Sequence, residues 1–585
     1  MYYLSRGFLK VSVIACGYLL LLIAVLGWPS SGVLVVGVVL ALAARWKARR
    51  WVTLGSARWA DEQDLRRAGM LRSSSGLVLG RIFTSARNGA AIRLLFQRSI
   101  TAKEACGQFW SMFRRNRCEV VRVEQAIHTA VFAPSGIGKG VSLIVPFLKE
   151  CEESAVVVDF KGENARLTAR HRREHFGHRV VALDPFGVYT DRSDSFNPLD
   201  FIDAKDSRAI DICNDLAKAL VVRNAEEKEP HWNDSAELWI AALIAMVVRY
   251  GEPGMRSLQT VREILSSPER IELAIKLMRE SDAWDGMLAR MGGQLSHYVD
   301  RERSSVLSTV TRHLKFLDTP AVAAVTQSSS FDPAGLVTDK TSIFAILPPE
   351  HMRAQAPLMR LWISSFLGAV VRGGLQTEKK VHFILDEAAS LGSLESIDDA
   401  VDKYRGYGVR MQFYYQSIGQ LKKCFPNGQD LTLLSNTTQI YFGVNEMQTA
   451  EIVSSRLGDQ TIVVESGGTS VGTSHQHSFG GHSHESSSHS HNSNSNWQQQ
   501  ARRLLKPEEV IGLSPRTAIT FTPGMPPICT SLIRHYEEPG WGIRPSRFRT
   551  LMKSGLVLAA SAAYCALSVL FGVLATKTFF GASRF

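Results

Sequence analysis

A short glycine-rich loop between two apolar runs most limits how this 585-residue chain can fold. The segment VFAPSGIGKGVS, residues 131–142, matches the phosphate-loop pattern G-x-x-x-x-G-K-[ST] at Gly138 and Lys139. It departs from the pattern at Ala133, where the first glycine belongs, and at Gly140, where the Ser or Thr that holds Mg²⁺ belongs. Such a loop binds phosphate chiefly through backbone N–H groups and the start of the next helix, so these changes leave the cradle intact.

We therefore predict a nucleotide site at this loop. Lys139 would supply a positive charge to the β- and γ-phosphates, and Gly136 and Gly138 would let the backbone approach closely. Without a hydroxyl at Gly140, Mg²⁺ must rely on water or another oxygen, and Ser142 would have to be shown to reach it. The predicted phosphate-binding residues are Pro134, Ser135, Gly136, Ile137, Gly138, Lys139, Gly140 and Val141.

A second apolar run, VHFILDEAASLG, ends in an acidic pair. A strand that carries a carboxylate at its end is what a Mg²⁺–nucleotide site needs opposite the loop. We predict that Asp386 holds Mg²⁺ through water and that Glu387 polarises the attacking water as a general base. The run AVVVDFKGE also ends on an acid, which leaves Asp159 and Lys161 as candidates for the edge of the pocket.

Apolar runs of strand length alternate with helical patterns through the middle of the chain. This alternation predicts an α/β fold with a parallel sheet covered on both faces. We expect the nucleotide-binding domain to comprise residues 129–205, 331–465 and 497–550, with a connecting region before it at 51–128. Residues 206–330 have mostly helical patterns, which predict an inserted all-alpha domain.

Three long apolar segments predict membrane spans. Residues 8–28 and 32–46 form an expected transmembrane hairpin within residues 1–50, and residues 555–576 form an expected third span. Lys and Arg flank both ends of the hairpin and are absent from its turn, which places both ends in the cytoplasm. We therefore expect a multi-pass membrane protein with most of its mass in the cytoplasm.

Charge and low-complexity segments limit the partners. The net charge of +12 suggests an anionic partner, either nucleic acid or acidic lipid. Eight scattered Cys without a C-x-x-C pair favour a reduced compartment. Residues 466–496 are rich in Ser and His, which predicts a disordered loop. Its six histidines could bind metal, but a solvated polar loop is the favoured interpretation.

Several unusual strings occur together in a fixed order along the chain. They include GSARWADEQDL, APSGIGKGVSLIVPFL, VVVDFKGENARLTA, SFNPLD, HWNDSAELW, ERSSVLSTVTRHLKFLDTP, ILDEAASLGSL, YYQSIGQL and ARRLLKPEEVIGL. Through these strings nearly the whole chain resembles the VirD4/TraG coupling proteins of type IV secretion and conjugation systems. Members of that family often have Lys-Gly where other phosphate-loop proteins have Lys-Ser or Lys-Thr. The glycine at position 140 therefore looks inherited.

The resemblance implies a RecA-like P-loop NTPase domain with the all-alpha domain inserted, an N-terminal transmembrane hairpin, and a homo-hexamer that binds ATP and Mg²⁺ between subunits. Lys139 corresponds to the loop lysine, and Asp386 and Glu387 correspond to the acidic pair. Gln416 in YYQS matches a glutamine that senses the γ-phosphate. Arg405 is assigned as the arginine donated to a neighbour's site, with Arg410 as the alternative. The third span departs from the family pattern.

The implied function is that of an ATPase in the bacterial inner membrane. It would recruit single-stranded DNA with its relaxase, or effector proteins, to a type IV secretion channel and drive their transfer by ATP hydrolysis. One alternative is a non-hydrolysing membrane receptor that the nucleotide only stabilises. Another is an FtsK-like DNA translocase, although the four N-terminal spans, long linker and winged helix of that class are not visible in the sequence.

Overall fold

The computed structural model describes residues 54–71, 73, 75–82, 120–124, 127–223, 229–376, 378–425, 428–476 and 486–537. The spans predicted within 1–50 and at 555–576 lie outside these residues. In the described part, one helix, α16 (Met352–Arg372), is long and apolar enough to cross a membrane. Because 67% of its most apolar window is buried inside the protein, it serves here as a core helix.

Seven parallel strands form one side of the sheet, ending at the edge strand β5. Their order is β9-β3-β8-β7-β4-β6-β5, and every neighbouring pair in this series is parallel. Each arises from an apolar run that the sequence marked as a strand. Their bounds are β3 (His128–Phe132), β4 (Ser154–Asp159), β5 (Arg179–Leu183), β6 (Thr341–Ile346), β7 (Val381–Leu385), β8 (Val409–Tyr415) and β9 (Thr437–Phe442).

Four antiparallel strands extend this sheet beyond β9 to eleven strands. They are β12 (Thr517–Phe521), β13 (Ile528–Ser531), β1 (Leu77–Ile82) and β2 (Val120–Val123). Residues 51–128 were expected to be a connecting, N-terminal part of the cytoplasmic region, and the strands described within them, β1 and β2, belong to the sheet. β1 and β2 complete the sheet because β13 offers an edge with which β1 can pair.

Helices cover both faces of the sheet. Along β4, Val156 and Val158 belong to one buried cluster, whereas Ala155 and Val157 belong to a second, as the two-residue period of a strand requires. The first cluster includes residues of α16, and the second includes residues of α6 (Val145–Glu150) and α7 (Glu163–Phe176). The remaining helices outside the insertion are α3 (Glu62–Arg67), α15 (Gly335–Thr338), α17 (Glu395–Asp402), α18 (Ile418–Cys424), α19 (Gln429–Asn436), α20 (Met447–Leu457) and α21 (Pro507–Ile511).

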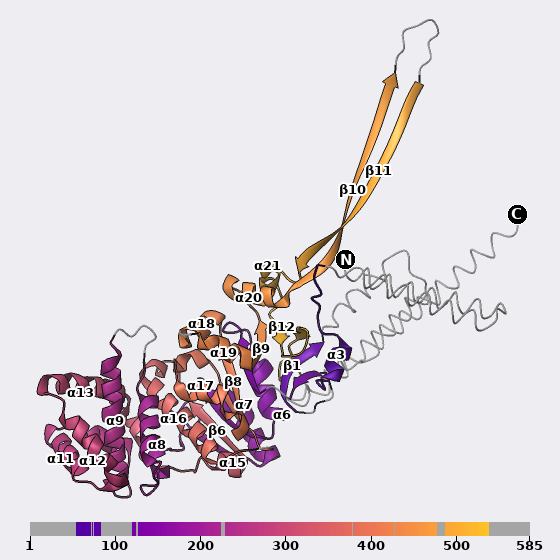
Figure 1. Cartoon of the computed structure of the whole chain (residues 1–585). Coiled ribbons are helices and arrows are strands. Elements are labelled where there is room, and N and C mark those ends of the chain that lie inside the picture. The colour runs from indigo at the N-terminus through magenta and orange to yellow at the C-terminus, as the bar shows by residue number, and fades with distance from the viewer. Residues whose placement is uncertain are drawn as a thin grey trace.

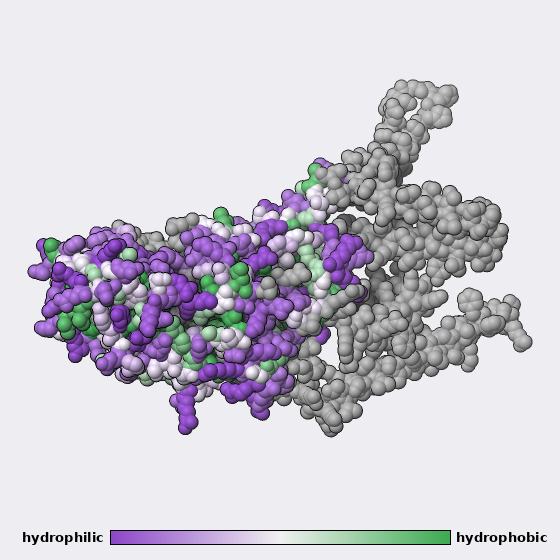
Figure 2. All heavy atoms as spheres, turned by 60° about the horizontal axis from the view of Figure 1, so that its bottom comes forward, coloured by the Kyte–Doolittle hydropathy of each residue, from purple (hydrophilic) through white to green (hydrophobic). Residues whose placement is uncertain are grey.

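The described residues between β5 and β6 are helical and contain no strand. Figure 1 shows α9, α11, α12 and α13 gathered at one end of the molecule, and Figure 2 shows hydrophilic residues over most of that end. The buried cluster of the sheet's first face continues into these helices. Their bounds are α8 (Ala209–Leu220), α9 (Pro230–Tyr250), α10 (Leu258–Ile264), α11 (Pro268–Arg279), α12 (Ala283–Ser296), α13 (Asp300–Leu314) and α14 (Pro320–Thr326).

A buried arginine joins the helical insertion to the sheet domain. Arg360, on α16, is 3% exposed. Its guanidinium donates to the carbonyls of Ala219 (2.9 Å) and Val221 (3.3 Å) at the end of α8. It also donates to the carbonyls of Leu391 (2.8 Å) and Ser393 (2.6 Å), in the loop that follows β7. The guanidinium group of Arg360 therefore donates hydrogen bonds to four backbone carbonyls from two parts of the chain.

The low-complexity segment contradicts its expected disorder. β10 (Asp459–Gln476) and β11 (Ser486–Arg503) pair antiparallel in unbroken register, and the ribbon projects away from the rest of the protein in Figure 1. The interpretation of residues 466–496 as a disordered loop was therefore wrong for 466–476 and 486–496. Strand pairing satisfies the backbone of both segments without any need for a buried apolar face.

Replacing Arg360 with Met should destabilise the protein by at least about 3 kcal/mol, since it leaves several buried carbonyls without a donor. The thermal unfolding midpoint should fall by several degrees. Arg170→Met is the control, because Arg170 forms only an exposed ion pair with Glu174 that contributes less than about 0.5 kcal/mol. Equal midpoints for the two variants would show that the Arg360 bridge contributes no net stability.

Candidate functional site

The predicted site residues come from the ends of three neighbouring strands. β3 leads into the glycine-rich loop, β7 ends just before Asp386, and β8, which pairs with both, ends just before Gln416. Parallel strands place their carboxyl ends at one edge of the sheet. β3 and β7 are separated by β8 alone, so their axes lie about 10 Å apart.

The glycine-rich loop adopts a conformation that requires glycine at two positions. Gly136 and Gly138 have φ angles of 79° and 103°, in the left-handed region that residues with a Cβ avoid. Ala133, at the first departure from the pattern, is fully buried, and its N–H donates to the Tyr415 carbonyl at 3.0 Å. A small side chain fits here, so the missing glycine does not disturb the loop.

Ile137 fixes the outer part of the loop against β9. A Cβ on Gly443, just after β9, would lie 2.4 Å from Cδ1 of Ile137. Gly443 also has a φ of 60°. The glycine therefore provides the space in which the loop isoleucine packs, a role that the sequence pattern did not reveal.

The helix after the loop begins with a π-turn, η1 (Gly140–Ile144), in which the Val145 N–H donates to the Gly140 carbonyl. Pro146 follows directly and has no N–H to complete a regular α-helical bond at that point. A Cβ on Gly140 would meet no close neighbour, since the nearest atom, Asn164 Oδ1, would be 3.8 Å away. Crowding therefore does not exclude Ser or Thr at position 140.

Two buried oxygens lie near the loop. Asn164 is buried and presents Oδ1 toward position 140. Ser142 is also buried, and its Oγ lies 3.8 Å from the place of a Cβ on Gly138. Asn164 Oδ1 is therefore near the region where the usual hydroxyl would lie, whereas Ser142 Oγ is placed beside Gly138. Asn164 was not among the predicted site residues.

Lys139 is 8% exposed, and its Nζ donates to the Ala133 carbonyl at 2.8 Å. Burial lowers the pKa of Lys139, while the negative charges of Asp386 and Glu387 act to raise it. The amine is thus held at the base of the loop, within electrostatic range of the acidic pair. The structure brings these three predicted residues together.

Asp386 is partly buried just beyond β7. Burial raises the pKa of Asp386 to about 6, with Asp159 and Glu387 adding to the rise and Lys139 opposing it. Asp159, at the end of β4, accepts from the N–H groups of Ala165 (2.9 Å) and Lys161 (3.4 Å). Its oxygens are therefore engaged by the start of α7, which leaves Asp386 as the better metal ligand.

Glu387 has a strained backbone, with φ 58° and ψ 52° in the left-handed region. Only three non-glycine residues in the described part of the chain have positive φ, and Glu387 is one of them. Its carbonyl accepts from the Ser390 N–H (2.9 Å) and hydroxyl (2.8 Å), which hold the turn. Strain of about 1–3 kcal/mol at an exposed carboxylate beside a phosphate loop is typical of a functional residue.

Gln416 and Arg405 lie at opposite ends of β8. Gln416 follows the strand at the loop edge, and its N–H donates to Oε1 of Gln420 at 2.9 Å. Arg405 is exposed on η5 (Tyr404–Tyr407), which precedes β8. The seven residues of β8 span about 23 Å, so Arg405 does not reach the loop of its own chain. Arg410, the alternative, is half-buried at the same far end of β8.

An arginine that the sequence did not single out approaches the loop from the end of the described chain. Arg534 Nε lies 3.9 Å from the place of a Cβ on Gly138. The neighbouring His535 N–H donates to the Val141 carbonyl at 2.9 Å and ties this segment to the loop helix. Nothing in the sequence around Arg534 separates it from other arginines, because only the folding of the segment after β13 puts it there.

The raised pKa of Asp386 predicts a pH dependence. The pKa of Asp386 in the folded chain, about 6, exceeds the ordinary value for aspartate, so ionisation of Asp386 destabilises the folded chain as pH rises between the two values. Mg²⁺ needs the ionised form. Between pH 7.5 and pH 5, the ionised fraction falls about tenfold, and Mg²⁺-dependent nucleotide affinity should fall by about the same factor. Titration of binding in wild type and Asp386→Asn tests this, since the variant should retain only the pH dependence of the nucleotide itself.

Comparisons with known proteins identify the family of the chain. Residues 58–562 match the family model described as "Type IV secretory system Conjugative DNA transfer". The chain is 25% identical over 494 residues to VirD4 of Rhizobium radiobacter, which covers 83% of this chain and 64% of that protein. It is 28% identical over 430 residues to TraG of Escherichia coli, covering 70% and 65%. The chain thus spans slightly less than two thirds of the length of these relatives.

Solved structures of the plasmid coupling protein TrwB share the fold. TrwB in complex with the ATP analogue ADPNP aligns with a TM-score of 0.57 at 15% identity, covering 85% of this chain and 98% of that one. The unbound TrwBdeltaN70 aligns with a TM-score of 0.52 at 17% identity, covering 71% and 88%. At this identity the likeness establishes the α/β fold alone. The family match covers most of the chain, and the protein therefore belongs to the family of type IV secretory system proteins for conjugative DNA transfer.

Proposed function

We propose that this protein is a membrane-anchored coupling ATPase with a RecA-like nucleotide-binding domain. It recruits a DNA–relaxase complex, or effector proteins, to a type IV secretion channel and drives transfer by ATP hydrolysis. The observation that carries this proposal is the placement of Lys139, Asp386 and Glu387 within mutual electrostatic range at one edge of the sheet. The names of the relatives, which are a conjugal transfer protein and a coupling protein, support the biological setting.

Each residue has a definable role in ATP hydrolysis. The N–H groups of residues 134–141 surround the phosphates, and Lys139 exchanges its bond to the Ala133 carbonyl for one to a phosphate oxygen. Glu387 accepts a proton from the attacking water. Gln416, between the loop and the acidic pair, donates to the γ-phosphate. Arg534 adds positive charge beside Gly138.

Asp386 and the oxygens of Asn164 and Ser142 are the groups suited to Mg²⁺ or its water ligands, because Mg²⁺ prefers oxygen. When bound, Mg²⁺ neutralises the charge that develops on the phosphates. Asn164 Oδ1 in particular would compensate for the missing hydroxyl at Gly140. A structure of TrwB in complex with ADP and Mg²⁺ supports Mg²⁺ as the ion bound with nucleotide in this fold.

Arg405 would complete the site of an adjacent subunit in a homo-hexamer. It is exposed, and it lies at the sheet edge opposite its own phosphate loop. Head-to-tail contact in a ring brings unlike edges of neighbouring subunits together. An arginine supplied in this way contributes about 10³–10⁵ to the rate in related phosphoryl-transfer reactions.

The predicted spans at 1–50 and 555–576 would anchor the protein in the bacterial inner membrane with its bulk in the cytoplasm. The net charge of +12 suits single-stranded DNA, whose phosphates require Lys and Arg without base-specific contacts. Channel components and the relaxase would be its protein partners.

Two substitutions test hydrolysis. Lys139→Ala should abolish nucleotide binding, whereas Glu387→Gln should retain binding and lower DNA-stimulated ATP turnover by at least about 100-fold. Lys276→Ala and Glu378→Gln are matched controls, since both residues are exposed outside the site. If the Glu387→Gln variant hydrolyses ATP as fast as the wild type, Glu387 is not the general base. Nucleotide binding without turnover in the wild type would favour the non-hydrolysing receptor.

A mixing experiment tests the arginine in trans. Lys139→Ala and Arg405→Ala chains should each be inactive. If they co-assemble at random in equal amounts, roughly a quarter of the sites pair an intact loop with an intact neighbouring arginine, and turnover should recover accordingly. The comparison is a mixture of Lys139→Ala with Arg410→Ala chains. If ATP turnover recovers only in that mixture, Arg410 and not Arg405 is the arginine supplied to the neighbouring site.

A further inference from the structure

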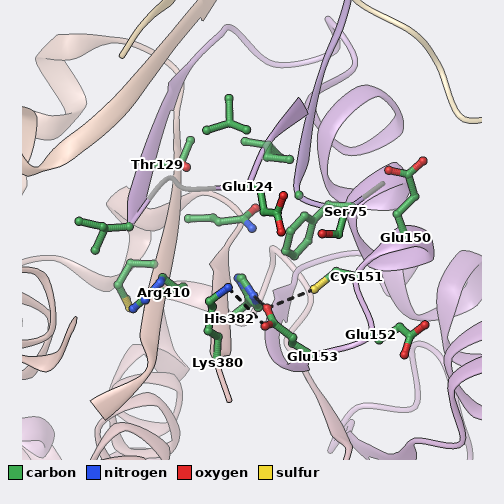
Figure 3. A pocket seen from close by; sticks show the side chains of 17 residues that line it. Ser75, Glu124, Thr129, Glu150, Cys151, Glu152, Glu153, Lys380, His382 and Arg410 are labelled. Carbon is green, nitrogen blue, oxygen red and sulfur yellow. Dashed lines mark hydrogen bonds and ion pairs between the residues drawn. The ribbon is translucent and has the colours of Figure 1, made fainter. Parts of the chain in front are cut away.

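A cavity of about 430 Å³ lies at the edge of the sheet opposite the phosphate loop. Its lining comes from the starts of β3, β7 and β8 and from the segment between α6 and β4. Figure 3 shows Cys151, Glu153, His382 and Lys380 together in this cavity. None of these residues takes part in the nucleotide chemistry proposed above.

Three of these side chains are potential metal ligands and face one another. The ligand atoms of Cys151, Glu153 and His382 all lie within 4.8 Å of each other. His382 Nε2 is 2.5 Å from Glu153 Oε2, and the Cys151 thiol donates to the same oxygen at 3.9 Å. A tetrahedral ion with bonds of about 2.0–2.3 Å holds its ligand atoms about 3.3–3.7 Å apart, so the His382 and Glu153 side chains need to separate by only about 1 Å to admit it.

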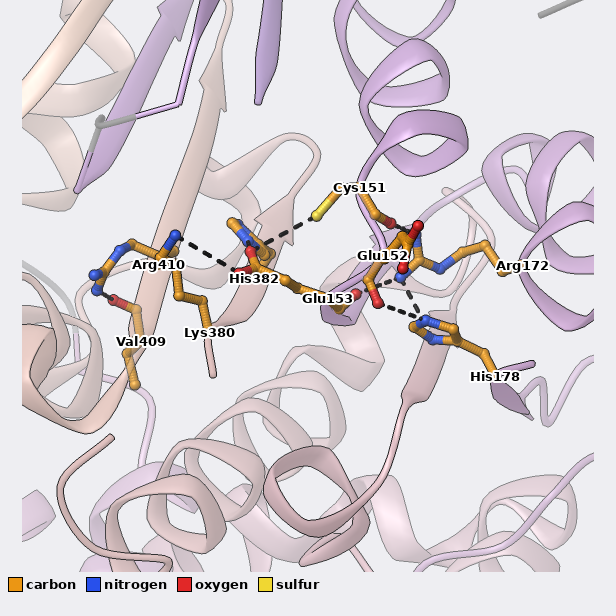
Figure 4. A network of polar contacts seen from close by, with 9 residues as sticks. All are labelled: Cys151, Glu152, Glu153, Arg172, His178, Lys380, His382, Val409 and Arg410. Carbon is orange, nitrogen blue, oxygen red and sulfur yellow. Dashed lines mark hydrogen bonds and ion pairs between the residues drawn. The ribbon is translucent and has the colours of Figure 1, made fainter. Parts of the chain in front are cut away.

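The backbone that carries two of the ligands is held rigidly. Arg172 is fully buried and donates to the carbonyls of Cys151 (2.8 Å) and Glu153 (2.5 Å). The His178 ring contacts the Glu152 carbonyl at 2.9 Å, as Figure 4 shows. Cys151 and Glu153 are thus fixed before any ligand binds, which reduces the entropic cost of binding.

The fourth residue orients the carboxylate. Lys380 Nζ lies 3.6 Å from Oε1 of Glu153, whereas Oε2 faces His382 and Cys151. Metal-binding carboxylates are commonly oriented by such outer contacts. Lys380 therefore leaves a single oxygen of Glu153 for an ion.

The donor set also suits a cation. Cys151 offers a sulfur, His382 a ring nitrogen and Glu153 a carboxylate oxygen, which are the three donor types that Zn²⁺ takes in proteins.

We propose that Cys151 Sγ, Glu153 Oε2 and the His382 ring bind one divalent ion of the Zn²⁺ type, with water from the cavity as the fourth ligand. Thiolate and imidazole select Zn²⁺ over Mg²⁺, which prefers oxygen. Binding forms metal–sulfur, metal–nitrogen and metal–oxygen bonds, and protons held by the ligand atoms pass to the solvent. The ion links the segment after α6 to the start of β7. Lys139 lies before η1, which leads into α6, and Asp386 lies just beyond the end of β7.

Cobalt substitution in the detergent-solubilised full chain tests the site. After treatment with a chelator, Co²⁺ should bind and give a thiolate-to-cobalt charge-transfer absorption that one equivalent of Zn²⁺ per chain abolishes. Zn²⁺ binding should release protons to the buffer, because the ligands bind the ion in their deprotonated forms. Cys151→Ser should lose the absorption and bind Zn²⁺ at this site more than about 100-fold less tightly, because even outer contacts contribute 10–100-fold.

Controls separate this site from other cysteines and from the ribbon histidines. Cys529→Ser removes a thiol on β13, outside the cluster, and should leave the absorption unchanged. The histidines of residues 466–496 can bind Co²⁺ but cannot give a thiolate band. Glu153→Gln and His382→Gln should each weaken Zn²⁺ binding, and Zn²⁺ should raise the thermal midpoint of wild type but not of these variants. Lys380→Met should change affinity by about tenfold or less.

The proposal is overturned if the absorption is absent in wild type or persists in Cys151→Ser. It is also overturned if Zn²⁺ raises the midpoints of wild type and of the Glu153→Gln and His382→Gln variants equally. In either case the cluster is a buried ion-pair network only. Each result is independent of ATP turnover.

Discussion

Parallel pairing of β3, β8 and β7 is the constraint on which the site depends. The backbone hydrogen bonds of this pairing bring the phosphate loop, Gln416 and the acidic pair to one sheet edge, although they are separated by about 250 residues of sequence between Lys139 and Asp386. Each side chain then needs only its ordinary length to reach a shared ligand. The large helical insertion between β5 and β6 does not disturb this arrangement, because it leaves and re-enters at neighbouring strands.

The two edges of the sheet offer different chemistry. The carboxyl edge presents backbone N–H groups, a buried lysine and carboxylates, which suit phosphate and a hard cation. The amino edge presents a thiol, an imidazole and one carboxylate oxygen, which suit a softer cation. β7 connects them, with His382 near its start and Asp386 just beyond its end. Arg360 adds a third link, from the loop after Asp386 to the helical insertion.

Local patterns predicted the parts of the molecule in which sequence neighbours determine structure. The apolar runs became the seven parallel strands, and Gly136 and Gly138 adopt the positive φ angles that the loop needs. Predictions from sequence patterns failed where pairing between distant segments determines the structure. β1 and β2 are apolar but fell within the connecting region, because β1 pairs with β13, which lies far away in the sequence. The polar segments of β10 and β11 were interpreted as disordered because they lack the apolar pattern of a strand. Arg534 and Asn164 were missed because only tertiary packing brings them to the loop.

The sequence by itself determined the α/β class, the phosphate loop and the identities of Lys139, Asp386 and Glu387, because each depends on residue types within a short segment. Tertiary structure alone decided which oxygens lie beside Gly140, that Arg405 is remote from its own loop, and that Cys151 meets His382. These depend on strand order and on the packing of segments hundreds of residues apart. No local pattern encodes such distances, because they result from the whole chain minimising its exposed apolar surface and unpaired backbone groups together.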